Sequence, residues 1–135
     1  MPDIDFAFLA DAAEAPPGQK FSVLGGGISR IGGRTFPLRQ PHLSLVAGIA
    51  VAATETDRDH AFRFVLLDPD GGEVAAADGS FSTHGAGDGR DTTITLAVDL
   101  WSLTFEQPGD YSFRILLNGS ERKRIPLLIS KVMDS

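Results

Sequence analysis

The sequence predicts an all-β protein: an immunoglobulin-like antiparallel β-sandwich of seven to nine strands, without a disulfide. Three observations predict this fold. Short apolar runs alternate with period two and are separated by turn residues, among them 15 glycines and 8 prolines in 135 residues. No stretch has the three- and four-residue apolar spacing of a long amphipathic helix. Residues 108–119 combine a turn, an alternating strand and an Asn-Gly hairpin signal.

Residues 108–119 are the most informative part of the chain. The apolar residues from Tyr111 to Leu117 fall on every second position, so one face of this strand is predicted to be buried. The Pro-Gly-Asp-Tyr sequence before it is typical of the corner by which many immunoglobulin-like sandwiches enter their sixth strand. There, the tyrosine hydroxyl bonds to nearby backbone. Asn118-Gly119 accepts the positive φ angles of a two-residue turn.

The first half of the chain predicts strands at residues 4–9, 20–24 and 43–53, with a loop at 10–19. Three glycines at 25–27 are expected to break the second strand. Residues 28–37 give no clear pattern beyond a short edge strand at 34–36. In the strand at 43–53, the alternating residues from Leu43 to Val51 are expected to point inward. Gly48, on the opposite face, indicates a bulge or close packing.

The second half predicts strands at residues 61–67, 73–77, 92–100 and 122–132. Residues 68–72 form a strong turn signal, and 82–90 are expected to be flexible. A short helical turn within 101–105 is expected to plug one end of the sandwich with Trp101, Leu103 and Phe105. The last strand should lie at a sheet edge or carry a bulge, because Pro126 lacks an N–H.

Size and charge limit the function classes. The length suits one domain spanning residues 1–135, which is large enough to bury a core that needs no disulfide or bound metal for stability. The absence of cysteine removes disulfides, thiolate metal sites and cysteine nucleophiles. The net charge of −6 argues against a nucleic-acid partner. No export signal or membrane-spanning apolar run is present, so we expect a soluble cytoplasmic protein without a membrane partner.

Several short motifs carry a resemblance to a known family. They are Leu9-Ala10-Asp11-Ala12-Ala13, Leu24-Gly25-Gly26-Gly27, Leu66-Leu67-Asp68-Pro69-Asp70-Gly71, the segment from Leu103-Thr104-Phe105 to Pro108-Gly109-Asp110-Tyr111, Asn118-Gly119 and Ile125-Pro126-Leu127. In their spacing, the chain resembles a family of short bacterial proteins described only as a domain of unknown function. The resemblance implies a free-standing β-sandwich, and it supplies no catalytic residue.

Two loop regions are candidates for ligands. The glycine-rich loop from Gly25 to Gly33 could cradle a phosphate with its backbone N–H groups, and Arg30 could neutralise an anion. However, the loop lacks the Lys-Ser/Thr ending of a P-loop. The acidic loops, with Asp68, Asp70 and Glu73 in one and Asp88 and Asp91 in the other, could converge on calcium. An irregular connection and a solvated turn are the simpler interpretations.

The remaining candidates have no motif that specifies chemistry. His42, His60 and His84 have no metal-ligand spacing, and Ser, His and Asp occur without a nucleophile elbow. The basic cluster of residues 122–124 is expected to protect an edge strand, although it could contact an acidic partner. Trp101 is expected in the core rather than as an exposed anchor for a partner.

These observations predict a non-enzymatic protein-interaction or structural module without catalytic residues, metal or cofactor. Its partner is expected to be another protein or a second copy of the chain, which would make a homodimer. The contact would use loops or an exposed edge strand, either the final strand or residues 73–77. The alternatives are a domain that binds calcium, an anion or a small ligand between its sheets, or a metal-dependent enzyme built on the glycine-rich or acidic loops.

Overall fold

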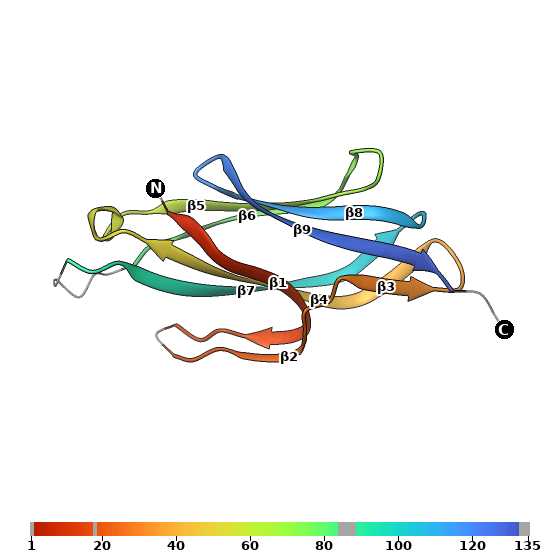
Figure 1. Cartoon of the computed structure of the whole chain (residues 1–135), viewed down its shortest axis with the longest axis horizontal. Helices are drawn as coiled ribbons and strands as arrows, with labels where there is room; N and C mark the ends of the chain where they lie inside the picture. The colour runs from red at the N-terminus through yellow and green to blue at the C-terminus, as the bar shows by residue number, and fades with distance from the viewer. Residues whose placement is uncertain (1, 18, 84–88, 133–135) are drawn as a thin grey trace.

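The computed structural model describes residues 2–17, 19–83 and 89–132, and over these residues the chain forms two β-sheets packed face to face (Figure 1). The four-stranded sheet has the order β2-β1-β4-β7 and comprises β1 (Asp3–Glu14), β2 (Ser22–Gly26), β4 (Leu38–Val51) and β7 (Thr92–Phe105). The five-stranded sheet has the order β3-β9-β8-β5-β6 and comprises β3 (Arg30–Gly33), β5 (His60–Leu67), β6 (Glu73–Phe81), β8 (Gly109–Leu117) and β9 (Ser120–Lys131). The predicted all-β class is confirmed.

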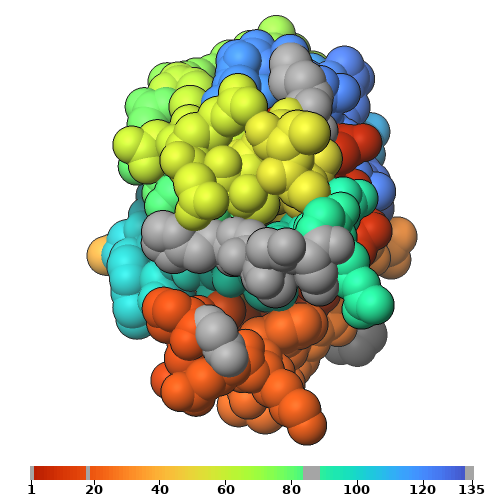
Figure 2. Space-filling view, turned by 90° about the vertical axis from the view of Figure 1, so that its left-hand side faces the viewer, coloured from red at the N-terminus to blue at the C-terminus, as the bar shows by residue number. Residues whose placement is uncertain are grey.

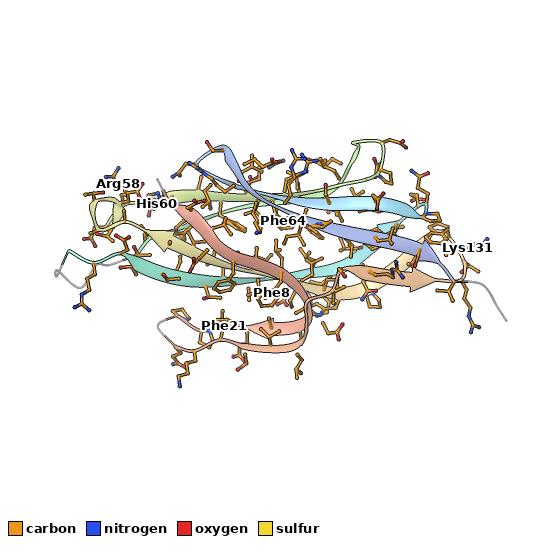
Figure 3. All side chains as sticks on the ribbon, in the orientation of Figure 1. Phe8, Phe21, Arg58, His60, Phe64 and Lys131 are labelled. Atoms are coloured by element: carbon orange, nitrogen blue, oxygen red, sulfur yellow. The ribbon has the colours of Figure 1, made fainter. Side chains whose placement is uncertain are left out.

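The core lies between the two sheets and follows the period-two pattern. The residues of β4 that were expected to point inward, from Leu43 to Val51 at every second position, are all buried. Phe64 of β5 faces them from the other sheet (Figure 3), and Phe113 of β8 packs beside it with ring centroids 6.0 Å apart. Each such side chain contributes about 1.5–3 kcal/mol when it is fully removed from water.

The predicted tyrosine corner is confirmed. The Tyr111 hydroxyl donates a hydrogen bond to the carbonyl oxygen of Gln107 over 2.7 Å, and its ring meets that of Phe105 edge-on. At the other end of β8, Asn118 and Gly119 have φ angles of +50° and +83°, so they form the predicted two-residue turn into β9.

Strand β9 is an edge along only part of its length. Residues 128–131 pair with β3 in the parallel sense, whereas residues 120–127, including Pro126, pair with β8 alone among the described strands. A register shift lies opposite the first half of β9, at Ile115/Leu116. Proline therefore stands where no neighbour needs its N–H, as the sequence predicted.

The predicted loop at 10–19 and glycine break at 25–27 are wrong in part. Strand β1 continues to Glu14, and β2 includes Gly25 and Gly26, because the two strands pair with each other as a hairpin. This β1–β2 hairpin folds under the outer face of the four-stranded sheet (Figure 1), where Phe21 stacks on Phe6. Gly48 lies directly against the Phe6 ring, which confirms the expected close packing.

Four further element predictions are wrong in whole or in part. Residues 34–36 are bends, and β4 begins at Leu38, before the predicted strand at 43–53. Strand β6 extends beyond residue 77 to Phe81, although its edge position is confirmed. Residues 101–105 continue β7 instead of forming a helical turn, because they pair with residues 38–42 of β4. Long-range pairing overrides the local pattern in each of these strands.

Candidate functional site: an open side of the sandwich

Strands β6 and β7 are edge strands of opposed sheets on the same side of the sandwich. Neither has a further partner along its outer edge among the described strands. Three hollows lie in line between the two strands, and we call them together the β6/β7 groove. The groove is lined along β6 by residues 73–75 and 77–81 and along β7 by residues 92–98 and 101–104. Its length therefore follows almost the whole of both edge strands.

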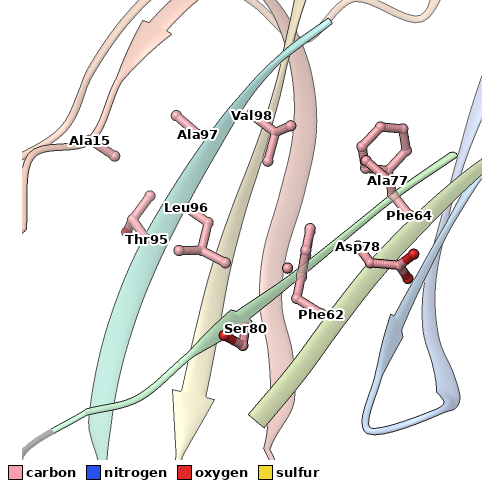
Figure 4. A pocket seen from close by; sticks show the side chains of 11 residues that line it. Ala15, Phe62, Phe64, Ala77, Asp78, Ser80, Thr95, Leu96, Ala97 and Val98 are labelled. Atoms are coloured by element: carbon pink, nitrogen blue, oxygen red, sulfur yellow. The ribbon is translucent and has the colours of Figure 1, made fainter. Parts of the chain in front are cut away.

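The middle of the groove is an apolar cleft of about 260 Å³ (Figure 4). Phe62 and Phe64 of β5 form one wall, and Leu96 and Val98 of β7 form the other. The two β7 side chains are only half-buried, although they lie on the inward face of their strand. Ala77, Gly79 and other small residues leave the mouth of the cleft open. Leu96 and Val98 are thus partly accessible from this side, whereas Phe62 and Phe64 are buried at the bottom of the cleft.

At one end, the groove runs past the tip of the β1–β2 hairpin. Pro16 and Pro17 of that tip and residues 81–83 and 92–96 line a hollow of about 680 Å³. Figure 2 shows this end of the molecule, with the hairpin lying below the start of β7. The hydroxyl of Thr83 is buried here and has no hydrogen-bond partner within the described residues. A buried hydroxyl without a partner costs about 1–3 kcal/mol, so a donor or acceptor entering this hollow would be favoured.

Strand β7 lacks the usual protection of an edge. Its 14 residues contain no Lys, Arg, Pro or Gly, and they are rich in β-branched side chains. The opposite edges of the two sheets are short: β2 has five residues and β3 has four, and each contains two glycines. Natural proteins protect edge strands with positive charge, proline or short length. An unprotected edge of this length is a template for another strand.

Trp101 of β7 is 70% exposed, so its predicted place in the core is wrong. Trp101 follows the buried Leu100 and points outward by ordinary strand alternation. Ser102, with a φ of +55° opposite Pro41, is a second outward residue, and this kink returns Leu103 to the inward face. Leu103 and Phe105 are buried as predicted. The indole packs on His42 with ring centroids 4.3 Å apart, and Trp101 is also among the residues that line the end of the groove.

His42, Ser44 and Asp99 lie together on the outer face of the four-stranded sheet, but not as a hydrolytic triad. The His42 Nε2 atom and the Ser44 hydroxyl both bond to Oδ1 of Asp99, at 2.8 and 3.2 Å. The Nδ1 atom of His42 is 2.8 Å from the carbonyl oxygen of Asp11. Ser44 is fully buried and bonds to the carboxylate rather than to the imidazole. The cluster therefore holds the histidine ring against Trp101.

The end of the groove beside Trp101 is negatively charged. Asp68, Glu73 and Glu106 line a hollow of about 470 Å³ together with Trp101 and Tyr111. Burial raises the pKa of Tyr111, the backbone N–H of Gln107, 3.5 Å from the hydroxyl oxygen, opposes the rise, and the charges of Asp68, Glu106 and Asp70 add to it. The negative field of these carboxylates thus reaches the buried phenol.

Two guanidinium groups stand at the rim of this end. Arg63 pairs with Glu73 at 3.4 Å and with Asp78 at 2.8 Å, and Arg39 donates to the Ser102 hydroxyl. Neither Arg39 nor Arg63 lines the hollow itself. The end beside Trp101 therefore stays acidic.

The glycine-rich loop does not present a phosphate cradle. The backbone N–H groups of Gly27 and Ile28 both donate to the carbonyl oxygen of Leu9, at 2.9 and 3.0 Å. The carboxylate of Asp11 lies directly beside Gly25 and would repel an anion. Arg30 begins β3 and pairs in register with β9. The local hydrogen bonds use the groups that an anion would need.

The acidic loops are used as turns. One Asp68 oxygen accepts bonds from the N–H groups of Asp70 and Gly72, at 2.9 and 2.7 Å. Glu73 turns toward Arg63. Over residues 2–17, 19–83 and 89–132, no three His, Asp or Glu side chains gather as a metal site would require. Asp88 lies outside the described residues.

His42 and His60 are not brought together. His42 is on β4 of one sheet, His60 is on β5 of the other, and His84 lies outside the described residues. His60 is 4% exposed and has structural partners: its Nδ1 atom is 3.1 Å from the Asn118 amide, and its Nε2 atom is 2.7 Å from the Glu55 carbonyl oxygen. His60 is therefore a buried structural histidine with both ring nitrogens in hydrogen bonds.

The basic cluster lies where it was expected, on the half of β9 that has one strand neighbour. Arg124 pairs with Glu121, which also binds Arg114. These two guanidinium groups lower the pKa of Glu121, with Arg124 as the larger cause. The final strand is therefore a charged, partly covered edge, and β7 is the open edge that sequence reasoning did not identify.

Comparisons with known proteins give a family without an assigned activity. The model of a family of unknown function, DUF6941, matches residues 5–130. No curated protein matches the chain. A solved structure of the Pseudomonas fluorescens alkylpurine DNA glycosylase AlkC, bound to DNA with an abasic site analog, is 13% identical with a TM-score of 0.44. That alignment covers 92% of this chain and 30% of the glycosylase, and a likeness this weak carries no functional argument.

No helix within the described residues is both long enough and apolar enough to cross a membrane.

Proposed function

Because the chain belongs to the family of unknown function DUF6941, its function must be argued from geometry, and we propose that it is a non-enzymatic protein-interaction module. It binds an extended segment of another protein in the β6/β7 groove by adding that segment as a strand to β7. The observation that carries this proposal is the coincidence of an unprotected strand edge with an open apolar cleft. Backbone hydrogen bonds to β7 supply affinity, and side chains in the cleft supply specificity.

The geometry of an added strand fits this cleft. Side chains directly opposite each other on paired strands point to the same face. A segment beside β7 would therefore direct the residues opposite Leu96 and Val98 toward Phe62, at every second position. Two apolar side chains there would cover core surface that the chain leaves half-exposed. We accordingly expect the partner segment to carry two apolar residues with one residue between them.

A free segment fits better than a second copy of the chain. In a dimer formed by two β7 strands, the inward side chains of each strand stay in their own sandwich. The cleft beside Phe62 and Phe64 would then remain unfilled. A segment without its own core has apolar side chains to insert. The homodimer expected from the sequence is therefore the alternative occupant that the test below must distinguish from a peptide segment.

The test uses the whole chain and a displayed library of random ten-residue peptides as the probe. Selected peptides are synthesised, and their affinity is measured for the wild type, Ala77→Trp and Ala76→Trp. Both alanines are exposed on β6, but only Ala77 lines the cleft. We expect Ala77→Trp to weaken binding at least about tenfold and Ala76→Trp to leave it unchanged. Circular dichroism checks that both variants keep the fold.

Three results would contradict the proposal. The first is that the library yields no binder. The second is that the selected peptides bind Ala77→Trp as well as Ala76→Trp. The third is a concentration-dependent dimer, seen by analytical ultracentrifugation, that Ala77→Trp dissolves, because the occupant would then be a second copy.

The immunoglobulin-like class is part of the same proposal. The tyrosine corner at the entry to β8 and the face-to-face packing of antiparallel strands support it. Cytoplasmic location, bacterial origin and the absence of a nucleic-acid partner stay predictions from the sequence.

A further inference from the structure

We infer that the strand bound in the β6/β7 groove carries a Lys or Arg side chain, which lies against Trp101 among the carboxylates of Glu73 and Glu106. This inference rests on the proposed strand addition and adds the chemistry of the partner. It is carried by an exposed indole and several carboxylates that line one hollow at one end of the groove.

The indole is held in place for such a contact. An exposed tryptophan on a regular strand would rotate freely, but here one face packs on the His42 ring. His42 is itself fixed by Asp99 and by the Asp11 carbonyl oxygen. The indole points outward from β7, on the same face as His42, and Trp101 also lines the hollow at this end of the groove. Tryptophan is the best aromatic partner for a cation, and the contact is strongest where water is partly excluded.

The charge at this end selects a cation over an anion or a neutral group. Asp68, Glu73 and Glu106 line the hollow, and Asp70 lies just behind it, bonded to Gln107. The Asp68 carboxylate is occupied by turn N–H groups and Glu73 is shared with Arg63, so Glu106 is the principal ion-pair partner. Glu106 makes no ion pair within the described residues. An anionic segment would meet like charge here.

Position along the strand follows from register. The apolar cleft lies beside residues 95–98 of β7, and the acidic hollow lies beside residues 101–104. Antiparallel pairing is slightly more stable than parallel pairing. An antiparallel segment has its N-terminal end beside Trp101, so its basic residue precedes the first inserted apolar residue by about three to five positions. The partner is an extended segment with a basic start and alternating apolar residues after it.

The first experiment determines whether the selected peptides have this sequence pattern. In peptides selected from the library and sensitive to Ala77→Trp, we expect Lys or Arg to be enriched about three to five positions before the alternating apolar pair. One selected peptide is then made with Lys and with norleucine, which keeps the aliphatic stem and removes the charge. The norleucine peptide should bind about tenfold more weakly. Because Trp101 is the sole tryptophan, its fluorescence should respond more to the Lys peptide.

Variants of the protein complete the test. Trp101→Leu and Glu106→Gln should each weaken the Lys peptide several-fold and leave the norleucine peptide unchanged. Asp59→Asn is the matched control, because it removes the same charge from an exposed site in the loop before β5. It should change the affinity for the Lys peptide only slightly, since salt screens the long-range attraction.

The outcomes separate the two proposals. If peptides bind and Ala77→Trp blocks them, but no basic residue is enriched and norleucine replaces Lys without loss, the cation site is refuted and strand addition stands. If the Lys peptide loses no affinity in Trp101→Leu or Glu106→Gln, the cation site is refuted as well. If no peptide depends on Ala77, strand addition itself fails.

Discussion

The tyrosine corner offers the most quantitative test of the fold, because Tyr111 is the sole tyrosine of the chain. The change is Tyr111→Phe, which keeps the ring and its edge-on contact with Phe105 but removes the hydroxyl. That hydroxyl is in a residue only 2% exposed, and it donates to the Gln107 carbonyl oxygen over 2.7 Å. The loss of one such bond costs about 0.5–1.5 kcal/mol of unfolding free energy.

This free energy converts into a measurable shift. For a chain of this size, about 1 kcal/mol corresponds to roughly 3–4 °C in the melting temperature. We expect urea titration and calorimetry to agree on a loss within this range. The control is Gln107→Ala, which removes an exposed side chain but keeps the backbone carbonyl, and it should stay within about 0.5 kcal/mol of the wild type.

The same residue predicts how stability responds to alkaline pH. The pKa of Tyr111 in the folded chain lies above its ordinary value of 10.0, mainly because of burial. The unfolded chain therefore loses this proton first as pH rises. The contribution of Tyr111 is fully present below about pH 10 and is lost as pH rises through the higher folded pKa. The stability difference between the wild type and Tyr111→Phe should thus narrow at alkaline pH.

The pH-dependent ultraviolet absorbance of tyrosinate checks the pKa directly, since Tyr111 is the sole tyrosine and the absorbance of Trp101 does not titrate. The folded protein should titrate at higher pH than the protein in concentrated urea. The reasoning about the corner is refuted if Tyr111→Phe is as stable as the wild type at neutral pH. It is also refuted if the phenol titrates at the same pH in the folded and unfolded chains.

Two further predictions concern glycines. A methyl group at Gly48 would collide with the Phe6 ring, so Gly48→Ala should cost about 1–3 kcal/mol in urea unfolding. Phe6→Leu in the Gly48→Ala background should restore part of that loss, and strictly additive effects would contradict the close contact. Gly119 has a φ of +83°, so Gly119→Val should lower the free energy of unfolding by about 1–2 kcal/mol. The control is Gly79→Val, which should be tolerated because Gly79 has open space around it on β6. Equal losses in the two variants would refute the turn assignment.

The inward pattern of β4 and β8 was determined by the sequence alone, whereas in β1 the expected shared face of Ile4, Phe6 and Phe8 is wrong, because a register shift between Ile4 and Phe6 puts Ala7 and Leu9 on the core side. Alternation from Leu43 to Val51 and from Tyr111 to Leu117 predicted which side chains are buried, because side-chain direction in a strand depends only on local backbone geometry. The turn at Asn118 and the bond of Tyr111 were predictable for the same reason, since each involves residues close together in the chain.

The candidate site could be predicted only in part. The sequence predicted contact through loops or an exposed edge strand and gave residues 73–77 as one candidate; the structure places these residues on the edge strand β6. The sequence contains the alternating Thr-rich run of β7, but nothing in it states whether that strand lies at the centre or the edge of a sheet. Trp101 is exposed because residues 101–105 continue β7 as a strand after the buried Leu100, and only the pairing of β4 with β7 decides this.

The sequence by itself therefore determined the all-β class, the buried face of most strands and the tight turns. Tertiary structure decided where each strand stands in its sheet, that β6 and β7 face each other across an open cleft, and that the carboxylates gather beside Trp101. The physical reason is the separation along the chain of the residues that determine each feature. Burial direction and turn geometry are set by neighbouring residues, whereas lateral strand order depends on hydrogen bonds between segments distant in the chain.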